Sequence, residues 1–200
     1  MSEKKSFDFW LARLISFLFH PIWLPLVYIS INHFGDPEFS KLFTLVSLCL
    51  VAFPGIVALG WMYARKEVDF FVMARGNRIV PLVGMLIGLA FFAVANGGFL
   101  PDRLFQGELM AVCILLVFIG LLVTLFWKIS LHMVGWGAVV GFAIAALFQL
   151  GTWPLLAASV PISVAVAWAR VRLGSHDMPQ IIVGFLTGVV AAILIAVAFP

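Results

Sequence analysis

The chain has 200 residues, of which 64% are hydrophobic and 10% are charged, and its mean hydropathy is +1.17. A soluble domain carries about 25% charged and about 45–50% apolar residues, so this composition excludes a soluble globular protein and indicates an integral membrane protein. The formal net charge is +3, with no basic stripe outside the expected membrane loops. Nucleic acid is therefore not expected as a partner.

The first half of the chain predicts three membrane spans. Residues 8–33 are expected to form an interfacial helical piece that continues into a first span broken by Pro21 and Pro25. Such prolines are tolerated where neighbouring helices satisfy the freed backbone groups. The second span is expected at residues 41–63 and the third at residues 79–97, with polar turns between them.

The second half predicts four more spans. They are expected at residues 107–127, 130–150 and 153–170, and from Ser175 to Pro200. Runs of about 18–23 apolar residues are long enough to cross a hydrocarbon core of about 30 Å. We therefore predict an all-α fold, a polytopic membrane bundle of about six to seven transmembrane helices, with residues 1–200 forming a single integral membrane domain.

Three polar islands interrupt the apolar sequence. They lie at residues 65–78, 128–132 and 169–180. Two predicted spans separate each island from the next, so all three should reach the same face of the membrane. Ionisable residues embedded in a membrane protein are costly, and they mark a functional site by default.

The predicted topology also sorts the cations. Ten of the 12 Lys and Arg residues fall on the face that holds the islands, and only Lys41 and Arg103 fall on the other. The ten are Lys4, Lys5, Arg13, Arg65, Lys66, Arg75, Arg78, Lys128, Arg170 and Arg172. Positive charge gathers in cytoplasmic loops, so this face is expected to be cytoplasmic. We expect a multi-pass protein of a bacterial inner membrane, surrounded by membrane lipids.

The side chains of the islands suit a phosphate group. Arginine presents a fixed fork of donors that matches phosphate oxygens, and Arg75, Arg78 and Arg170 supply it. Phosphoryl transfer needs positioning, charge stabilisation, a nucleophile and an acid for the leaving oxygen. The structural alternatives are a loop of snorkelling cations and a helix cap beside an interfacial histidine.

Local signals add detail to the third island. Ser175 is expected to cap the last span, which would place His176 at a helix N-terminus where an anion is favoured. Gln180 follows His176 by four residues, so its amide oxygen is expected to accept a hydrogen bond from the His176 ring. Ser130 is likewise expected to cap its span, with His132 in the first turn.

Together, the islands resemble the three signatures of the type 2 phosphatidic acid phosphatase superfamily, membrane relatives of the vanadium haloperoxidases. The family's third signature is Ser-Arg, five residues, His, three residues, Asp, and here Ala169-Arg170 is followed at those spacings by His176 and Gln180. The second is Pro-Ser-Gly-His, and here it reads Ile129-Ser130-Leu131-His132. The first, Lys, six residues, Arg-Pro, is approached by Arg78 and Pro81, preceded by Arg75. The similar core covers about residues 65–190.

The resemblance implies hydrolysis of a lipid phosphate or diphosphate, of the phosphatidic acid or polyprenyl diphosphate class, without metal or cofactor. It implies that His176 attacks phosphorus to give a phosphohistidine and that His132 protonates the leaving alcohol. Arg78, Ser130 and Arg170 would hold the phosphate oxygens, with Arg75 as a further phosphate-binding candidate.

The sequence departs from the family pattern at several positions. Gln180 replaces the aspartate that orients the nucleophile, Leu131 replaces a glycine, and Phe71 stands where the first signature has its lysine. A carboxylate-to-amide change in a comparable triad costs about 10⁴ in rate. Asp69 or Asp177 is a candidate replacement for the missing carboxylate. The family site usually faces the outer side of the membrane, in conflict with the charge bias.

Two other functional classes fit parts of this pattern. A non-catalytic lipid-phosphate binding or transport protein would keep the same fold without the aspartate. A small-solute transporter would need paired broken helices or an internal repeat, which the sequence does not show.

Overall fold

Helices make up the regular structure of the described part of this chain, in which there is no strand. The computed structural model describes residues 6–21, 57, 60–65, 74–95, 104–151 and 153–198. The predicted all-α class is confirmed.

Three helices are long and apolar enough to cross a membrane. They are α6 (Leu131–Leu150), α7 (Pro154–Arg172) and α8 (Met178–Ala198). They match the last three predicted spans to within a few residues, and they are compatible with a membrane protein. Gly151 ends α6 in the left-handed conformation, with φ +66°, where its N–H donates to the Leu147 carbonyl at 3.0 Å.

Two further apolar helices form a hairpin beside these three. The short 3₁₀ helix η2 (Gly76–Arg78) leads into α4 (Ile79–Ala95), and α5 (Leu104–Phe126) packs against α4. These helices match the spans predicted at 79–97 and 107–127. Of the predicted first span, the structure describes α1 (Phe7–Leu18) and the residues up to Pro21. The remainder of that span, and most of the one predicted at 41–63, lie outside the described residues.

The contact between α6 and α8 is the most extensive helix packing in the described bundle, and glycines remove the side chains between the two backbones. A Cβ at Gly188 would collide with the Val134 carbonyl oxygen, and one at Gly137 with the Phe185 carbonyl oxygen. Farther along, a Cβ at Gly141 would lie 2.6 Å from the Val189 oxygen. Small residues spaced in this way let membrane helices approach closely. Matching positions increase together along both helices, so α6 and α8 run parallel and begin at the same end of the bundle.

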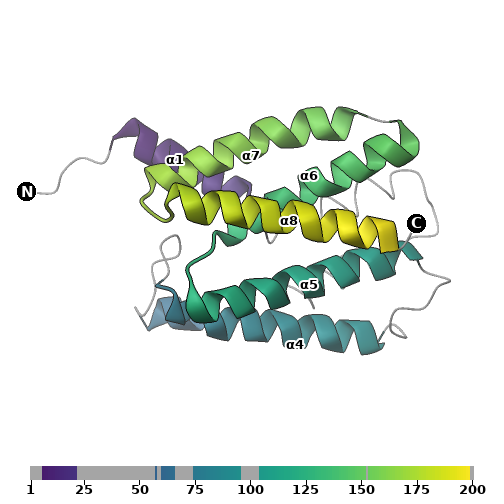
Figure 1. Ribbon diagram of the computed structural model, residues 1–200. Coiled ribbons are helices and arrows are strands. Elements are labelled where there is room, and N and C mark those ends of the chain that lie inside the picture. The colour runs from purple at the N-terminus through teal and green to yellow at the C-terminus, as the bar shows by residue number, and fades with distance from the viewer. Residues whose placement is uncertain are drawn as a thin grey trace, which may run out of the picture.

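Several chain segments that are far apart in sequence meet at that end (Figure 1). The α7–α8 connection, the α5–α6 connection, η2 and α1 all lie toward the left of the view. The α6–α7 turn and the C-terminal end of α8 lie at the opposite end. The polar islands around residues 74–78, 128–132 and 169–180 are therefore gathered at one end, as the count of crossings predicts.

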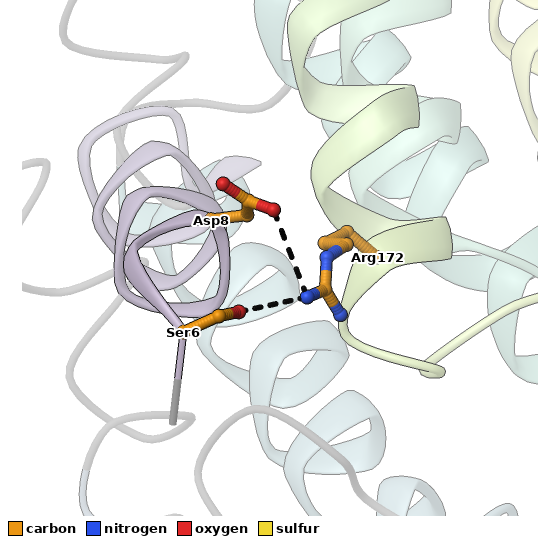
Figure 2. Close-up of polar contacts among 3 residues, drawn as sticks. All are labelled: Ser6, Asp8 and Arg172. Atoms are coloured by element: carbon orange, nitrogen blue, oxygen red, sulfur yellow. Dashed lines mark hydrogen bonds and ion pairs between the residues drawn. The ribbon is translucent and has the colours of Figure 1, made fainter. Parts of the chain in front are cut away.

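Helix α1 is fixed to this end by contacts at both of its termini. At its start, Arg172 of α7 donates to the Ser6 hydroxyl at 2.8 Å and lies 3.8 Å from the Asp8 carboxylate (Figure 2). Beyond its end, the Phe19 carbonyl accepts from the Trp136 indole N–H at 2.9 Å. The Phe19 and Trp136 rings also meet edge to face, in a core cluster with Met133, Val166 and Ile181.

A methyl group at Gly188 should separate α6 from α8. Gly188→Ala places a Cβ against backbone atoms that cannot rotate away, so we expect a loss of about 1–3 kcal/mol, as for overpacked cores. The midpoint of thermal unfolding in detergent measures this loss. Gly60→Ala is the matched control, since a Cβ there has no described atom within 4 Å. Equal midpoints for the two variants would contradict the close packing of α6 and α8.

Candidate functional site

The end of the bundle that holds α1 buries an unusual number of polar side chains. Each is less than a tenth exposed, although charged and polar groups bury poorly without partners. They are Ser16, Arg78, Ser130, His132, Arg170, Ser175 and His176.

Arg78 belongs to the first polar island and contacts residues of the other two. Its Nη1 donates to the Ile129 carbonyl at 2.8 Å, and its Nη2 lies 3.3 Å from His176 Nε2. Both partners are uncharged, and no carboxylate among the described residues hydrogen-bonds to this buried guanidinium. Arg75 lies at the exposed rim, where its Nη1 donates to the Phe126 carbonyl at 2.6 Å.

The protonation of His176 follows from its two ring contacts. Nδ1 lies 2.7 Å from Gln180 Oε1, an acceptor, so Nδ1 carries the proton. Nε2 then holds the lone pair and accepts from Arg78. The orientation of the Gln180 amide is set in turn by Asp177, whose Oδ2 accepts from Gln180 Nε2 at 3.0 Å. The predicted hydrogen bond between His176 and Gln180 is confirmed.

The turn from α7 into α8 explains how His176 reaches this position. Gly174 takes φ +63°, and the N–H groups of Ser175 and His176 both point back to the Arg170 carbonyl, at 3.0 and 3.4 Å. The predicted N-cap was wrong by two residues. Helix α8 begins at Met178, and Asp177 caps it through a 3.0 Å bond from the Gln180 N–H to Oδ1. Ser175 is instead buried within the turn, because the chain folds back over α7 before α8 starts.

Ser130 occupies the N-cap position of α6, as predicted, but its hydroxyl makes no capping bond. The residue is fully buried, and its Oγ has no hydrogen-bond partner among the described residues. Its backbone joins the third island, since the Ser130 N–H donates to the Gln180 carbonyl at 3.3 Å. A buried hydroxyl without a partner is costly, and it is therefore available to a ligand.

His132 is positioned by α1 rather than by the third island. Its Nε2 lies 3.2 Å from the Ser16 carbonyl oxygen, so Nε2 carries the proton and Nδ1 holds the lone pair. The His20 ring lies against it, with centroids 4.7 Å apart and edge to face. The segment that follows α1 thus lies beside His132.

Positive charge converges on His176. Burial lowers the pKa of His176 to about 3, and the charges of Arg78, Arg170 and Lys128 lower it further. The hydrogen bond that Nδ1–H donates to Gln180 Oε1 acts in the opposite direction. Burial also lowers the pKa of Lys128, with Arg78 and Arg170 contributing and Asp177 opposing. His176 is therefore a neutral base at pH 7, next to several cations.

The structure brings together most of the side chains that the sequence singles out. Arg78, His176 and Gln180 are connected by hydrogen bonds, and Ser130 adjoins them through its backbone. Arg170 is buried beneath the same turn. Arg75 is at the rim, and His132 is joined to α1.

Sequence reasoning assigned too little weight to two residues. Asp177, considered only as one of two substitutes for the missing carboxylate, contacts Gln180 through both of its oxygens. The signal for this contact was present, because an acidic residue three positions before a glutamine is a capping pattern. His20, which no motif of the sequence singles out, lies against His132. That contact joins residues 112 positions apart, and no local pattern predicts it.

Comparison with family models, curated proteins and solved structures gives no match for this chain. The chemistry of the site therefore rests on its own geometry. A buried guanidinium without a described carboxylate partner and an unused hydroxyl favour an anion with several acceptor oxygens, and the neutral imidazole beside them offers a lone pair. Among the described residues, no group of three or more His, Cys, Asp or Glu side chains could hold a metal ion.

Arg78→Lys should weaken anion binding. Lysine cannot reproduce the fork that contacts both Ile129 and His176, so we expect about a tenfold to hundredfold loss of affinity for orthovanadate, as for a lost charge-assisted hydrogen bond. Vanadium NMR titration in detergent measures the dissociation constant. Arg172→Lys is the control, because Arg172 contacts only Ser6 and Asp8 among the described residues. Equal losses in both variants would place the anion elsewhere.

The lowered pKa of His176 predicts a pH dependence of stability. The folded state holds this group at a pKa of about 3, against 6.5 in the unfolded chain, so below pH 6.5 the unfolded state binds more protons. The stability contributed by the neutral ring is complete above pH 6.5 and is lost as pH falls toward 3. Between pH 6.5 and pH 3, the melting temperature should fall less steeply with decreasing pH for His176→Gln than for the unsubstituted protein. Identical slopes would contradict the burial of a neutral His176.

Proposed function

We propose that the protein is a membrane phosphatase that hydrolyses a lipid phosphate or diphosphate through a histidine nucleophile. The observation that carries the proposal is the fixed tautomer of His176. Its Nδ1 proton is held by Gln180, and its Nε2 lone pair is directed at a buried arginine. A nucleophilic imidazole needs one unprotonated nitrogen beside the group that binds the electrophile.

The neighbouring donors would hold the phosphoryl oxygens. Arg78 and Arg170 contribute buried positive charge, and Ser130 contributes a hydroxyl with no described partner. Donors aimed in advance at developing charge contribute much of the stabilisation of a phosphoryl-transfer transition state. Arg75 and Lys128, which are less buried, would attract the substrate at the rim.

The proposed reaction has two balanced steps. In the first, the Nε2 lone pair of His176 forms a bond to phosphorus while the bond from phosphorus to the leaving lipid oxygen breaks, and Nδ1 of His132 passes a proton from the substrate's phosphate monoanion to that oxygen. In the second, water attacks phosphorus and the N–P bond breaks, while Nδ1 of His132 passes a proton of the water to the phosphate that is released. Because Nε2 of His132 is committed to the Ser16 carbonyl, Nδ1 is the nitrogen left to exchange protons.

Membrane placement follows from the apolar helices. We propose six to seven crossings in total, to which α4, α5, α6, α7 and α8 contribute five. The cation bias supports a site on the cytoplasmic face, against the outer face usual in the resembling family. The bacterial inner membrane is part of the same proposal. A lipid substrate would enter laterally with its headgroup at the level of Arg75 and Lys128.

A lipid-phosphate binding or transport protein is the second candidate. The observation that favours it is Gln180, because a neutral amide stabilises the charged ring of a phosphohistidine less than a carboxylate does. Such a protein would use the same arginines and Ser130 without forming a bond to phosphorus.

Phosphate release from phosphatidic acid and from polyprenyl diphosphate, in detergent with EDTA, separates these functions. We expect EDTA-resistant turnover that falls about 10³-fold or more in His176→Ala, because the nucleophile is lost. Arg172→Lys should retain the activity, since its contacts are with Ser6 and Asp8.

A second measurement tests the intermediate. Labelled substrate quenched in base should leave a phosphoryl group on the protein that acid removes, as expected for an N–P bond, and His176→Ala should not carry it. Saturable binding of both lipids with no turnover and no labelled protein would overturn the phosphatase proposal in favour of the binding function.

A further inference from the structure

We propose that Asp177 is a positioning residue that acts through Gln180 to fix the tautomer of His176. The carboxylate, the amide and the imidazole form a single relay in which each hydrogen bond determines the direction of the next. The catalytic meaning of the relay rests on the proposed function, whereas its effect on the His176 tautomer does not.

The relay is defined by three distances. Asp177 Oδ2 accepts from Gln180 Nε2 at 3.0 Å, and Asp177 Oδ1 accepts from the Gln180 N–H at 3.0 Å. Gln180 Oε1 then lies 2.7 Å from His176 Nδ1. Because a carboxylate can only accept, the amide must turn its NH₂ toward Asp177 and its oxygen toward His176.

Without that constraint, the amide could present either end to the ring. With its NH₂ toward His176, Nδ1 would have to hold the lone pair and Nε2 the proton. Nε2–H would then face the Arg78 guanidinium, 3.3 Å away, donor against donor. Asp177 therefore selects the only tautomer that leaves the Nε2 lone pair toward Arg78.

Asp177 is also the N-cap of α8, so its structural role has to be separated from its role in the relay. The cap uses Oδ1, and the relay uses Oδ2. Asparagine is as good an N-cap as aspartate, and its Oδ1 can keep the bond to the Gln180 N–H. Its Nδ2 then replaces the acceptor with a donor at the position of Oδ2. Asp177→Asn therefore changes the relay while it keeps the cap.

The decisive measurement is the tautomer of His176 in the full chain, read from ¹⁵N chemical shifts of histidine-labelled protein in detergent micelles. The chain has four histidines, so the spectrum is sparse, and His176→Gln assigns the signal. We expect the Nδ1–H form to dominate in the unsubstituted protein. In Asp177→Asn the Gln180 amide should reverse and shift the ratio about tenfold toward Nε2–H, the size of one hydrogen-bond preference.

A second substitution should restore the tautomer. In Asp177→Asn/Gln180→Glu the new carboxylate accepts both from the Nδ2 of the introduced asparagine and from His176 Nδ1, and the total charge of the pair is unchanged. The Nδ1–H form should return, whereas Gln180→Glu alone brings two carboxylates together. If turnover is present, kcat should fall about 10- to 100-fold in Asp177→Asn with little change in KM, and it should recover in the double variant.

The outcomes separate the relay from both the cap and the phosphatase proposal. Asp177→Asn with an unchanged melting temperature and a shifted tautomer supports the relay. An unchanged tautomer in Asp177→Asn, or no recovery in the double variant, overturns it and leaves Asp177 as a helix cap. If no lipid phosphate is hydrolysed, the phosphatase proposal fails, but the tautomer ratios still decide the relay.

Discussion

The contact between Arg78 and His176 holds the described site together. It joins residues 98 positions apart, and the same guanidinium also binds the carbonyl that precedes Ser130. A buried arginine is costly to desolvate, and a neutral imidazole with a neutral carbonyl offsets only part of that cost. The charge of Arg78 is therefore left without a described counter-charge, at the point where η2, the α5–α6 connection and the α7–α8 turn meet.

Glycine packing makes this contact possible. The parallel helices α6 and α8 begin beside one another because Gly137, Gly184 and Gly188 leave no side chain between the backbones. A Cβ at Gly184 would lie 2.8 Å from the Ser130 carbonyl, directly below the site. In a lipid environment van der Waals contact is a main source of helix association, so small residues position the polar end as effectively as a polar network would.

The pair formed by Gln180 and Asp177 determines how the His176 ring is hydrogen-bonded. A carboxylate bonded directly to His176 would stabilise the protonated ring and raise its pKa. A neutral amide fixes the tautomer of the ring and raises the pKa less. The Asp177 carboxylate contacts Gln180 rather than the ring, where it accepts from the Gln180 amide and caps α8. Burial and the nearby cations keep the ring neutral, and the Gln180 amide holds the ring proton on Nδ1.

Much of this architecture could be predicted from the sequence because a long apolar helix is a local feature, visible as a continuous run of apolar residues. Long apolar runs predict α4 to α8 within a few residues, and an even number of helices between the islands brings Arg78, Ser130 and His176 to one end of the bundle. Gln180 reaches His176 through a spacing of four residues, which is also a local property.

Other features depended on the tertiary structure. The docking of Ser16 and His20 on His132 arises from contacts between segments that are far apart in the sequence. The burial of the Ser130 hydroxyl, without a described hydrogen-bond partner, is likewise decided by how the helices pack. Residue type states what a side chain can donate or accept. Only the packing of the helices decides which partner it meets, because burial removes the water that would otherwise satisfy every polar group equally.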